Sequence, residues 1–228
     1  EGDFAITLTP DSAARTLTVS DNGIGMTRDE LENNLGTIAR SGSLDFKTEN
    51  KSDTLDIIGQ FGVGFYSAFM VADKVTVISR AYGEDKAWKW ESSGAEGYTI
   101  EAAEKAGVGT DITLHIKENT ENENYDGYLN EYQLRAIVKK YSDYIRYPIK
   151  MLVTHSHMLP KPEDAGDDLK PEYEEHKEME TLNSMVPIWK RKKGEVTSEE
   201  YNEFYKNTFY DYNDPALFFT AVGEGMVS

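Results

Sequence analysis

Short segments in which apolar and polar residues alternate restrict the fold of this chain more than any other feature of its sequence. Between residues 4 and 20 the alternation continues on both sides of a Pro-Asp-Ser turn, which predicts a β-hairpin. The same period of two, with glycine-bearing turns between the segments, predicts further strands. These are 74–80, 87–91 and 110–116. Residues 149–154 are expected to form a last strand.

Helical signals lie between the strands. Thr27 and Glu30 form a capping box, which predicts a helix that starts at Thr27. Residues 65–72 are apolar on nearly all sides and predict a buried helix. A third helix is predicted from an apolar stripe that comprises Leu134, Ile137, Val138, Tyr141 and Ile145, with Pro148 marking its end. Strands in a meander with helices grouped around them predict an α+β fold, a two-layer sandwich of a mainly antiparallel sheet with helices on one face.

The composition changes after residue 160. Residues 161–180 carry nine acidic and three basic side chains, two prolines and almost no large aliphatic residue. Such a composition is typical of a linker. Apolar content then returns, and Thr197 with Glu200 predicts another capped helix. We therefore expect a first domain over 1–160, an acidic linker over 161–181 and the start of a second domain over 182–228.

Net charge and composition exclude several classes of partner. The formal net charge of −17 argues against a general nucleic-acid binder, because a phosphate backbone would be repelled. No apolar run approaches the roughly 20 residues that cross a bilayer, so no membrane partner is expected. The absence of cysteine excludes disulfides and thiolate metal sites and is compatible with a reducing compartment.

Two smaller groups of side chains have ordinary explanations. His155 and His157 would share one face of a strand, but no further ligand cluster accompanies them, so no metal site is predicted. The basic run 190–193 lies beside much acid and is more typical of a solvated surface than of a nucleic-acid patch.

The run from Asp21 to Met26 (Asp-Asn-Gly-Ile-Gly-Met) lies between a predicted strand and a capped helix. Taken alone, its Asn-Gly pair is more typical of a turn. The alternative is a ligand site. There Asp21 would accept a hydrogen bond from an exocyclic amine such as that of adenine, and Gly23 and Gly25 would let the base approach the backbone closely.

Two glycine-rich runs follow. Residues 59–67 (Gly-Gln-Phe-Gly-Val-Gly-Phe-Tyr-Ser) lead into a predicted helix, where backbone N–H groups and the helix dipole favour phosphate. The run lacks the Walker-type Gly-Lys-Ser/Thr and equally fits a flexible loop. Residues 107–110 (Gly-Val-Gly-Thr) open a strand, which is a common arrangement. If the first run binds adenine, Thr110 supplies a hydroxyl beside Asp21.

The order and spacing of these three runs resemble those of the superfamily of gyrases, histidine kinases, mismatch-repair proteins and ninety-kilodalton chaperones. Within that superfamily, residues 33–42 (Asn-Asn-Leu-Gly-Thr-Ile-Ala-Arg-Ser-Gly), followed by residues 58–67, resemble the heat-shock protein 90 chaperone family, of the bacterial high-temperature protein G type. The likeness extends from about residue 3 to residue 155 and resumes at 186–189. It implies that the first domain is a nucleotide-binding domain and that the second is the start of the middle domain.

The resemblance also implies a site for ATP or ADP with Mg²⁺. In such a site Asp21 holds the adenine amine, and Gly25 and Thr110 assist through ordered water. Met26 and Phe65 pack near the nucleotide.

A lid over residues 36–64 that closes over bound ATP is implied as well. Asn34 lies near the sugar or the phosphates, and the backbone from Gln60 to Phe65 wraps the phosphates. The implied nucleotide contacts in this region are Arg40, Ser41, Gly42, Gln60, Phe61, Gly62, Val63 and Gly64. Arg40 stands where family members usually carry lysine, so the charge is kept while a bidentate fork replaces a point charge.

Catalytic residues are the main departure from the family pattern. The family's first long helix carries a glutamate that activates water and an asparagine that helps to hold magnesium, and both precede the segment that matches Phe4. The middle-domain arginine that reaches the terminal phosphate has no counterpart before Ser228. Hydrolysis needs positioned water and charge stabilisation together. We therefore expect this chain to be a poor ATPase with no catalytic residue of its own.

Two functions follow from these expectations. One is an ATP-dependent molecular chaperone of which the chain is a fragment, with unfolded or partly folded client proteins as partners and a homodimer in the full-length protein. The other is a nucleotide-binding module without turnover. The acidic linker is short for a eukaryotic cytosolic relative, which favours a bacterial cytoplasm. The resemblance also implies a role in the stress response.

Overall fold

The computed structural model describes residues 3–36, 64–95, 97–158, 173–192, 194–209 and 211–219. The chain divides into two compact units. The first comprises Glu1–Asp143 and Tyr147–Asn183, and the second comprises Tyr144–Arg146 and Ser184–Ser228.

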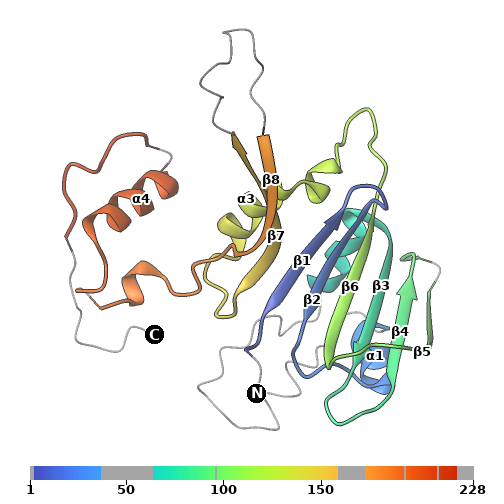
Figure 1. Ribbon diagram of the computed structural model, residues 1–228. Helices are drawn as coiled ribbons and strands as arrows, with labels where there is room; N and C mark the ends of the chain where they lie inside the picture. Colours follow the sequence, from blue (N-terminus) through green and yellow to red (C-terminus); the bar gives the residue numbers. More distant parts are fainter. Residues whose placement is uncertain are drawn as a thin grey trace. The chain divides into compact units, whose positions relative to one another are not determined.

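The first unit is built on one sheet of eight strands (Figure 1). In spatial order the strands are β5 (Tyr98–Ala103), β4 (Ala87–Ser92), β3 (Ala72–Arg80), β6 (Gly109–Ile116), β2 (Thr16–Asp21), β1 (Ile6–Asp11), β7 (Ile149–Met158) and β8 (Tyr173–Thr181). Neighbouring strands are antiparallel except for β1 and β7, which are parallel. The predicted α+β fold with a mainly antiparallel sheet is therefore confirmed.

Four short helices complete the described part of this unit. They are α1 (Arg28–Leu35), the 3-10 helices η1 (Gly64–Met70) and η2 (Asp126–Leu129), and α3 (Glu131–Tyr141). Helix α1 packs on the sheet through Leu31 and Leu35, which join Val75, Val77 and Trp90 in the hydrophobic core.

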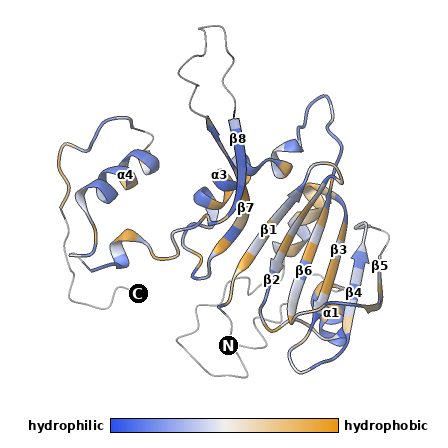
Figure 2. Ribbon diagram, viewed as in Figure 1, coloured by the Kyte–Doolittle hydropathy of each residue, from blue (hydrophilic) through white to orange (hydrophobic). Residues whose placement is uncertain are grey.

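The core lies on one face of the sheet. The register of the strands shows this, since directly opposite residues share a face. Val77 of β3 lies opposite both Trp90 and Ile112, and Leu8 of β1 lies opposite both Val19 and Met151. Strand β3 carries several apolar residues, whereas β8 is hydrophilic along most of its length (Figure 2).

Helix α3 covers the same face at the other end of the sheet. Its Leu134 and Val138 are buried, and its Arg135 pairs with Glu180 of β8. Glu180 lies opposite Met151 and so shares the core face.

The predicted capping box is confirmed at Thr27. Its Oγ1 accepts a hydrogen bond from Glu30 N at 3.3 Å, and the Glu30 carboxylate accepts one from Thr27 N at 2.7 Å. Both bonds satisfy donors that would otherwise lack a partner at the helix start.

We expect Thr27→Ala to lower the free energy of unfolding by about 1 kcal/mol, because it removes the acceptor for Glu30 N. Urea denaturation followed by circular dichroism measures the change. Thr27→Ser keeps the hydroxyl and is the matched control, so an equal loss in both variants would contradict a capping role.

The sequence placed two helices wrongly. Residues 64–70 form a 3-10 helix rather than a buried α-helix, and Ala72 already belongs to β3. None of the seven residues of η1 is fully buried, although Phe65, Ala68 and Phe69 pack partly against the core. Helix α3 ends at Tyr141, so Ile145 lies outside it, and its Tyr141 is exposed.

The sequence also missed two strands. Residues 173–181, which were expected to belong to the linker, form β8 and pair antiparallel with β7, so 149–154 was not the last strand. Its acidic composition is compatible with a strand at the edge of a sheet, where charged side chains discourage further pairing. The second missed strand is β5, which lies at the other edge of the sheet.

The second unit contains η3 (Ile188–Lys190) and α4 (Ser198–Phe209). The capping box predicted there is confirmed, since Glu200 N donates to Thr197 Oγ1 at 3.2 Å and Thr197 N donates to the Glu200 carboxylate at 2.8 Å. Trp189 contacts the rings of Tyr144 and Phe204 edge-on, at centroid distances of 5.1 and 5.9 Å.

Candidate functional site

A row of polar residues closes one end of the core face. Asp21, the last residue of β2, lies opposite Thr110 of β6, and Thr110 lies opposite Ser79 of β3. These three residues continue the same face as Val19, Ile112 and Val77, because residues two apart in a strand point to the same side. The apolar face of the sheet therefore ends in a carboxylate and two hydroxyls.

Hydrogen bonds fix the two hydroxyls. Ser79 Oγ lies 2.8 Å from Thr110 Oγ1 and 3.2 Å from the Gly109 carbonyl oxygen, and it accepts a hydrogen bond from Met26 N at 2.8 Å. Ser79 is fully buried and Thr110 nearly so. The connection between β2 and α1 is therefore tied to the centre of the sheet by a buried side chain.

The Asp21 carboxylate is partly engaged. Its Oδ1 accepts a hydrogen bond from Gly23 N at 2.8 Å, which closes a local turn. Among the described residues no other donor reaches this carboxylate, so Oδ2 is available to a ligand. Asp21 is half-buried, and in a partly desolvated position a free carboxylate oxygen discriminates strongly for a hydrogen-bond donor.

Two glycines bring backbone segments together around this row. Gly25 has φ +66°, and a Cβ there would lie 1.9 Å from the Arg80 carbonyl oxygen. Gly109 has φ +120°, and a Cβ there would lie 2.1 Å from the Asp21 carbonyl oxygen. Gly25 was predicted to let a base approach the backbone. In the structure, the lack of a side chain at Gly25 lets the connection between β2 and α1 lie against the backbone of Arg80.

The described structure joins some of the predicted site residues. Asp21, Gly25, Met26 and Thr110 lie together around Ser79 through the hydrogen bonds and strand pairs given above. Phe65 packs partly against the core, with its ring 5.5 Å from that of Trp90.

The other predicted residues are not joined to this group. Asn34 lies half-buried on α1, and no hydrogen bond within the described ranges links it to Asp21. Gly64 begins η1 and is exposed. Arg40, Ser41, Gly42, Gln60, Phe61, Gly62 and Val63, like most of the predicted lid, lie outside the described residues.

Sequence reasoning missed Ser79. The available signal was its position, since Ser79 follows Val75 and Val77 at the spacing that faces the core, and a polar residue there needs a partner. Tyr66 was also not singled out. Its hydroxyl donates to the Leu35 carbonyl oxygen at 3.0 Å, and burial, with a smaller contribution from Tyr98, raises its pKa.

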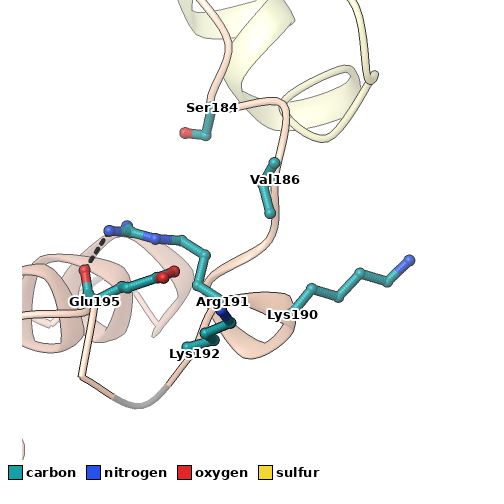
Figure 3. Close-up of a pocket in the computed structure, with 6 residues that line it drawn as sticks. All are labelled: Ser184, Val186, Lys190, Arg191, Lys192 and Glu195. Atoms are coloured by element: carbon teal, nitrogen blue, oxygen red, sulfur yellow. Dashed lines mark hydrogen bonds between the residues drawn. The ribbon is translucent and has the colours of Figure 1, made fainter.

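A pocket in the second unit lies around the basic run (Figure 3). The Arg191 guanidinium pairs with the Glu200 carboxylate and donates to the Glu195 carbonyl oxygen, each at 2.5 Å. Lys190 points away from Glu195 in the view of Figure 3. The arginine of this pocket is thus already paired with a carboxylate, and Lys190 and Lys192 line it as well.

Comparisons with known proteins assign the class of this chain. Residues 5–120 match the family described as histidine kinase-, DNA gyrase B-, and HSP90-like ATPase, and residues 160–228 match the family described as Hsp90 protein. The chain belongs to the HSP90-like ATPase family, as the sequence motifs predicted.

The chain is also similar to individual proteins of known name. The chain is 59% identical over 213 residues to chaperone protein HtpG of Bacillus subtilis, covering 93% of this chain and 33% of that protein. It is 57% identical over 229 residues to chaperone protein HtpG of Natranaerobius thermophilus, covering 99% of this chain and 35% of that protein. The chain thus spans about a third of the length of these relatives.

No helix within the described ranges is long and apolar enough to cross a membrane.

Proposed function

We propose that this chain binds ATP or ADP at the polar row of Asp21, Thr110 and Ser79, as part of an ATP-dependent molecular chaperone. The single observation that carries the proposal is the Asp21 carboxylate at the end of an apolar face, whose Oδ2 meets no donor among the described residues while its backbone pairs with strands on both sides. A flat base beside an apolar surface, with one polar group read by a fixed carboxylate, fits this arrangement.

Each neighbouring group has a part in this proposal. Asp21 Oδ2 accepts a hydrogen bond from the exocyclic amine of adenine. The Ser79–Thr110 hydroxyl pair offers a further partner to an ordered water between base and sheet. Met26 and Phe65, both half-buried beside the core, supply apolar contact to the ligand.

Magnesium fits the proposal as an ion carried by the nucleotide. Mg²⁺ keeps several waters and is bound largely through substrate phosphates, so it needs few ligands from this chain. We assign it no protein ligand among the described residues. The phosphates themselves are proposed to meet the backbone from Gln60 to Phe65 and the side chain of Arg40.

The domain assignment is part of the proposal. We assign the nucleotide-binding domain to the eight-stranded unit, extended through β8, and the start of the middle domain to the second unit. The Hsp90 family match to residues 160–228 supports the second assignment. Since relatives are named as chaperones, we further propose client proteins as partners, a homodimer for the full-length protein and a cytoplasmic location.

Calorimetric titration of ADP with Mg²⁺ into the chain tests the proposal. Asp21→Asn replaces a charged acceptor by an amide and is expected to weaken ADP binding by roughly 10- to 100-fold, the equivalent of one hydrogen bond to a charged group. GDP carries a carbonyl where adenine has its amine, so it is expected to bind the unaltered chain far more weakly than ADP.

Asp111→Asn is the matched control. Asp111 lies between Thr110 and Ile112, which both face the core, so its own side chain points to the opposite face of the sheet. There it pairs with Lys105. Its substitution is expected to leave ADP affinity unchanged. If Asp21→Asn binds ADP as tightly as the unaltered chain, the nucleotide does not bind at this row. A folded chain that binds no ADP at all would refute the proposed function.

A further inference from the structure

Three of the chain's four histidines lie together on the β7–β8 hairpin. His155 and His157 alternate along β7 and therefore share a face, as predicted. The structure adds His176 of β8, which lies directly opposite His155. Directly opposite residues share a face, so all three imidazoles project from the same side of the hairpin.

The three rings form a compact triangle. Their centroids are separated by 4.8 Å (His157–His176), 5.2 Å (His155–His176) and 6.5 Å (His155–His157). A tetrahedral ion that binds three imidazole nitrogens at about 2.0–2.1 Å holds the ring centres about 5 Å apart. The backbone of the hairpin therefore already supplies the spacing that such an ion requires.

Ring orientation differs from that of a loaded site. The rings are nearly parallel, with interplanar angles of 8°, 23° and 17°, and no three metal-binding side chains within the described ranges converge on a common point. Rotation about χ2 brings the nitrogens together, and this torsion has a broad, shallow profile in histidine. His157 and His176 are exposed, and among the described residues the ring contacts of these two side chains are with each other and with His155.

A carboxylate already orients one of the rings. Glu180 Oε1 lies 2.5 Å from His155 Nε2, and Glu180 Oε2 accepts a hydrogen bond from Arg135 Nη2 at 2.6 Å. Arg135 thus holds the carboxylate from its second oxygen, while the first oxygen meets the His155 ring. A carboxylate on one ring nitrogen directs the lone pair of the other nitrogen toward a metal and raises its basicity.

The surrounding charge also favours a cation. Glu174 lies opposite His157, and Glu178 lies opposite Val153, so both glutamates share the face of the three histidines. Glu174 is placed to approach an ion held by His157 and His176.

We propose that His155, His157 and His176 bind a zinc ion, with Glu174 or water as the fourth ligand and Glu180 as the carboxylate that orients His155. Imidazole and carboxylate are the donors that Zn²⁺ accepts in tetrahedral sites. The site is independent of the proposed nucleotide site, because none of its residues belongs to the row of Asp21, Thr110 and Ser79.

Calorimetric titration of Zn²⁺ into the tag-free chain near pH 7.5 tests the proposal, with one ion bound per chain as the expected stoichiometry. Loss of an outer carboxylate partner weakens metal binding by about 10- to 100-fold, so Glu180→Gln is expected to fall in this range. His176→Ala removes a direct ligand and is expected to weaken binding at least as much. Millimolar Mg²⁺ is not expected to compete, since it prefers oxygen ligands.

His115→Ala is the matched control, because His115 is the remaining histidine and lies on β6. It is expected to bind Zn²⁺ as the unaltered chain does. In proton NMR, Zn²⁺ is expected to shift the imidazole C–H signals of three histidines and to leave that of His115 in place.

Several results would overturn the assignment. They are Zn²⁺ affinity that is unchanged in His176→Ala, loss of bound Zn²⁺ to Mg²⁺ competition, or the absence of Zn²⁺ binding by the folded chain. Each would mean that the three stacked histidines only pack against one another or that Zn²⁺ binds diffusely to the acidic surface.

Discussion

Gly25→Ala is expected to lower the free energy of unfolding by about 3 kcal/mol and to abolish ADP binding. Two costs add here, a left-handed backbone conformation that a β-carbon disfavours by about 1–2 kcal/mol and an overpacking penalty of similar size. The added Cβ would lie 1.9 Å from the oxygen and 2.6 Å from the carbon of the Arg80 carbonyl, which are both backbone atoms with no rotamer to escape.

Gly25→Ala is also expected to displace residues of the proposed site. The connection that contains Gly25 is joined to β3 and the residues after it by two hydrogen bonds of 2.8 Å, from Met26 N to Ser79 Oγ and from Tyr82 N to the Ile24 carbonyl oxygen. Displacing Gly25 from Arg80 strains both bonds and moves the loop that begins at Asp21.

Gly83→Ala separates the two causes. Gly83 has φ +82°, similar to Gly25, but a Cβ there would meet no atom within 4 Å. Its substitution is expected to cost only about 1 kcal/mol and to leave ADP binding intact. Urea denaturation and ADP titration of both variants measure the difference. Equal effects would show that conformation alone, rather than the contact with Arg80, explains the requirement for glycine.

Trp90→Ala is expected to lower the free energy of unfolding by about 3–5 kcal/mol, the usual range for removing a buried tryptophan. Trp90 is only 2% exposed and lies in the core with Leu31 and Val77. Its ring contacts those of Phe65 edge-on at 5.5 Å and Tyr98 in a stack at 5.9 Å. Truncation thus leaves a cavity between α1, η1 and the sheet.

Trp90→Phe is the control that separates the effect of lost side-chain volume from the effect of the lost indole N–H. Trp90 Nε1 is buried, and no hydrogen-bond partner for it lies within the described structure. Phenylalanine therefore removes a polar atom without leaving an acceptor unpaired, and we expect a loss of about 1–2 kcal/mol from reduced volume alone. Chemical denaturation of the two variants distinguishes them, and a similar loss in both would mean that the indole N–H contributes a hydrogen bond.

Local signals in the sequence predicted much of the fold. Both capping boxes and the first hairpin were correct, because each rests on residues close in the chain whose hydrogen bonds are made locally. The strands at the centre of the sheet were also found, since one buried face imposes a clear period of two.

Elements that depend on distant partners were predicted less well. Strand β8 is charged and exposed along most of its length, and only its pairing with β7 makes it a strand. Strand β5 is likewise held by a single neighbour. Helix α3 was extended too far, because the periodicity of Ile145 continued past the point where the chain turns toward β7.

The residues of the two proposed sites show the same contrast between local signals and distant partners. Asp21 and Thr110 could be paired from motif order and family resemblance, whereas Ser79 becomes part of the site only through the register of β3 with β6. His176 joins the other histidines through the register of β7 with β8, inside a segment whose composition indicated a linker.

Strand β6 joins two blocks of the sheet. The β1–β2 hairpin and the β3–β4–β5 meander each pair neighbours in sequence, but β2 and β3 meet only through β6, which lies between them. The pairing of β6 with β2, like that of β7 with β1, joins residues far apart in the sequence, and loop-closure entropy makes such non-local pairing slow. Thr110 and Gly109 both arrive with β6. During synthesis the proposed nucleotide site is thus expected to form only after β6 has been made and has paired at the centre of the sheet.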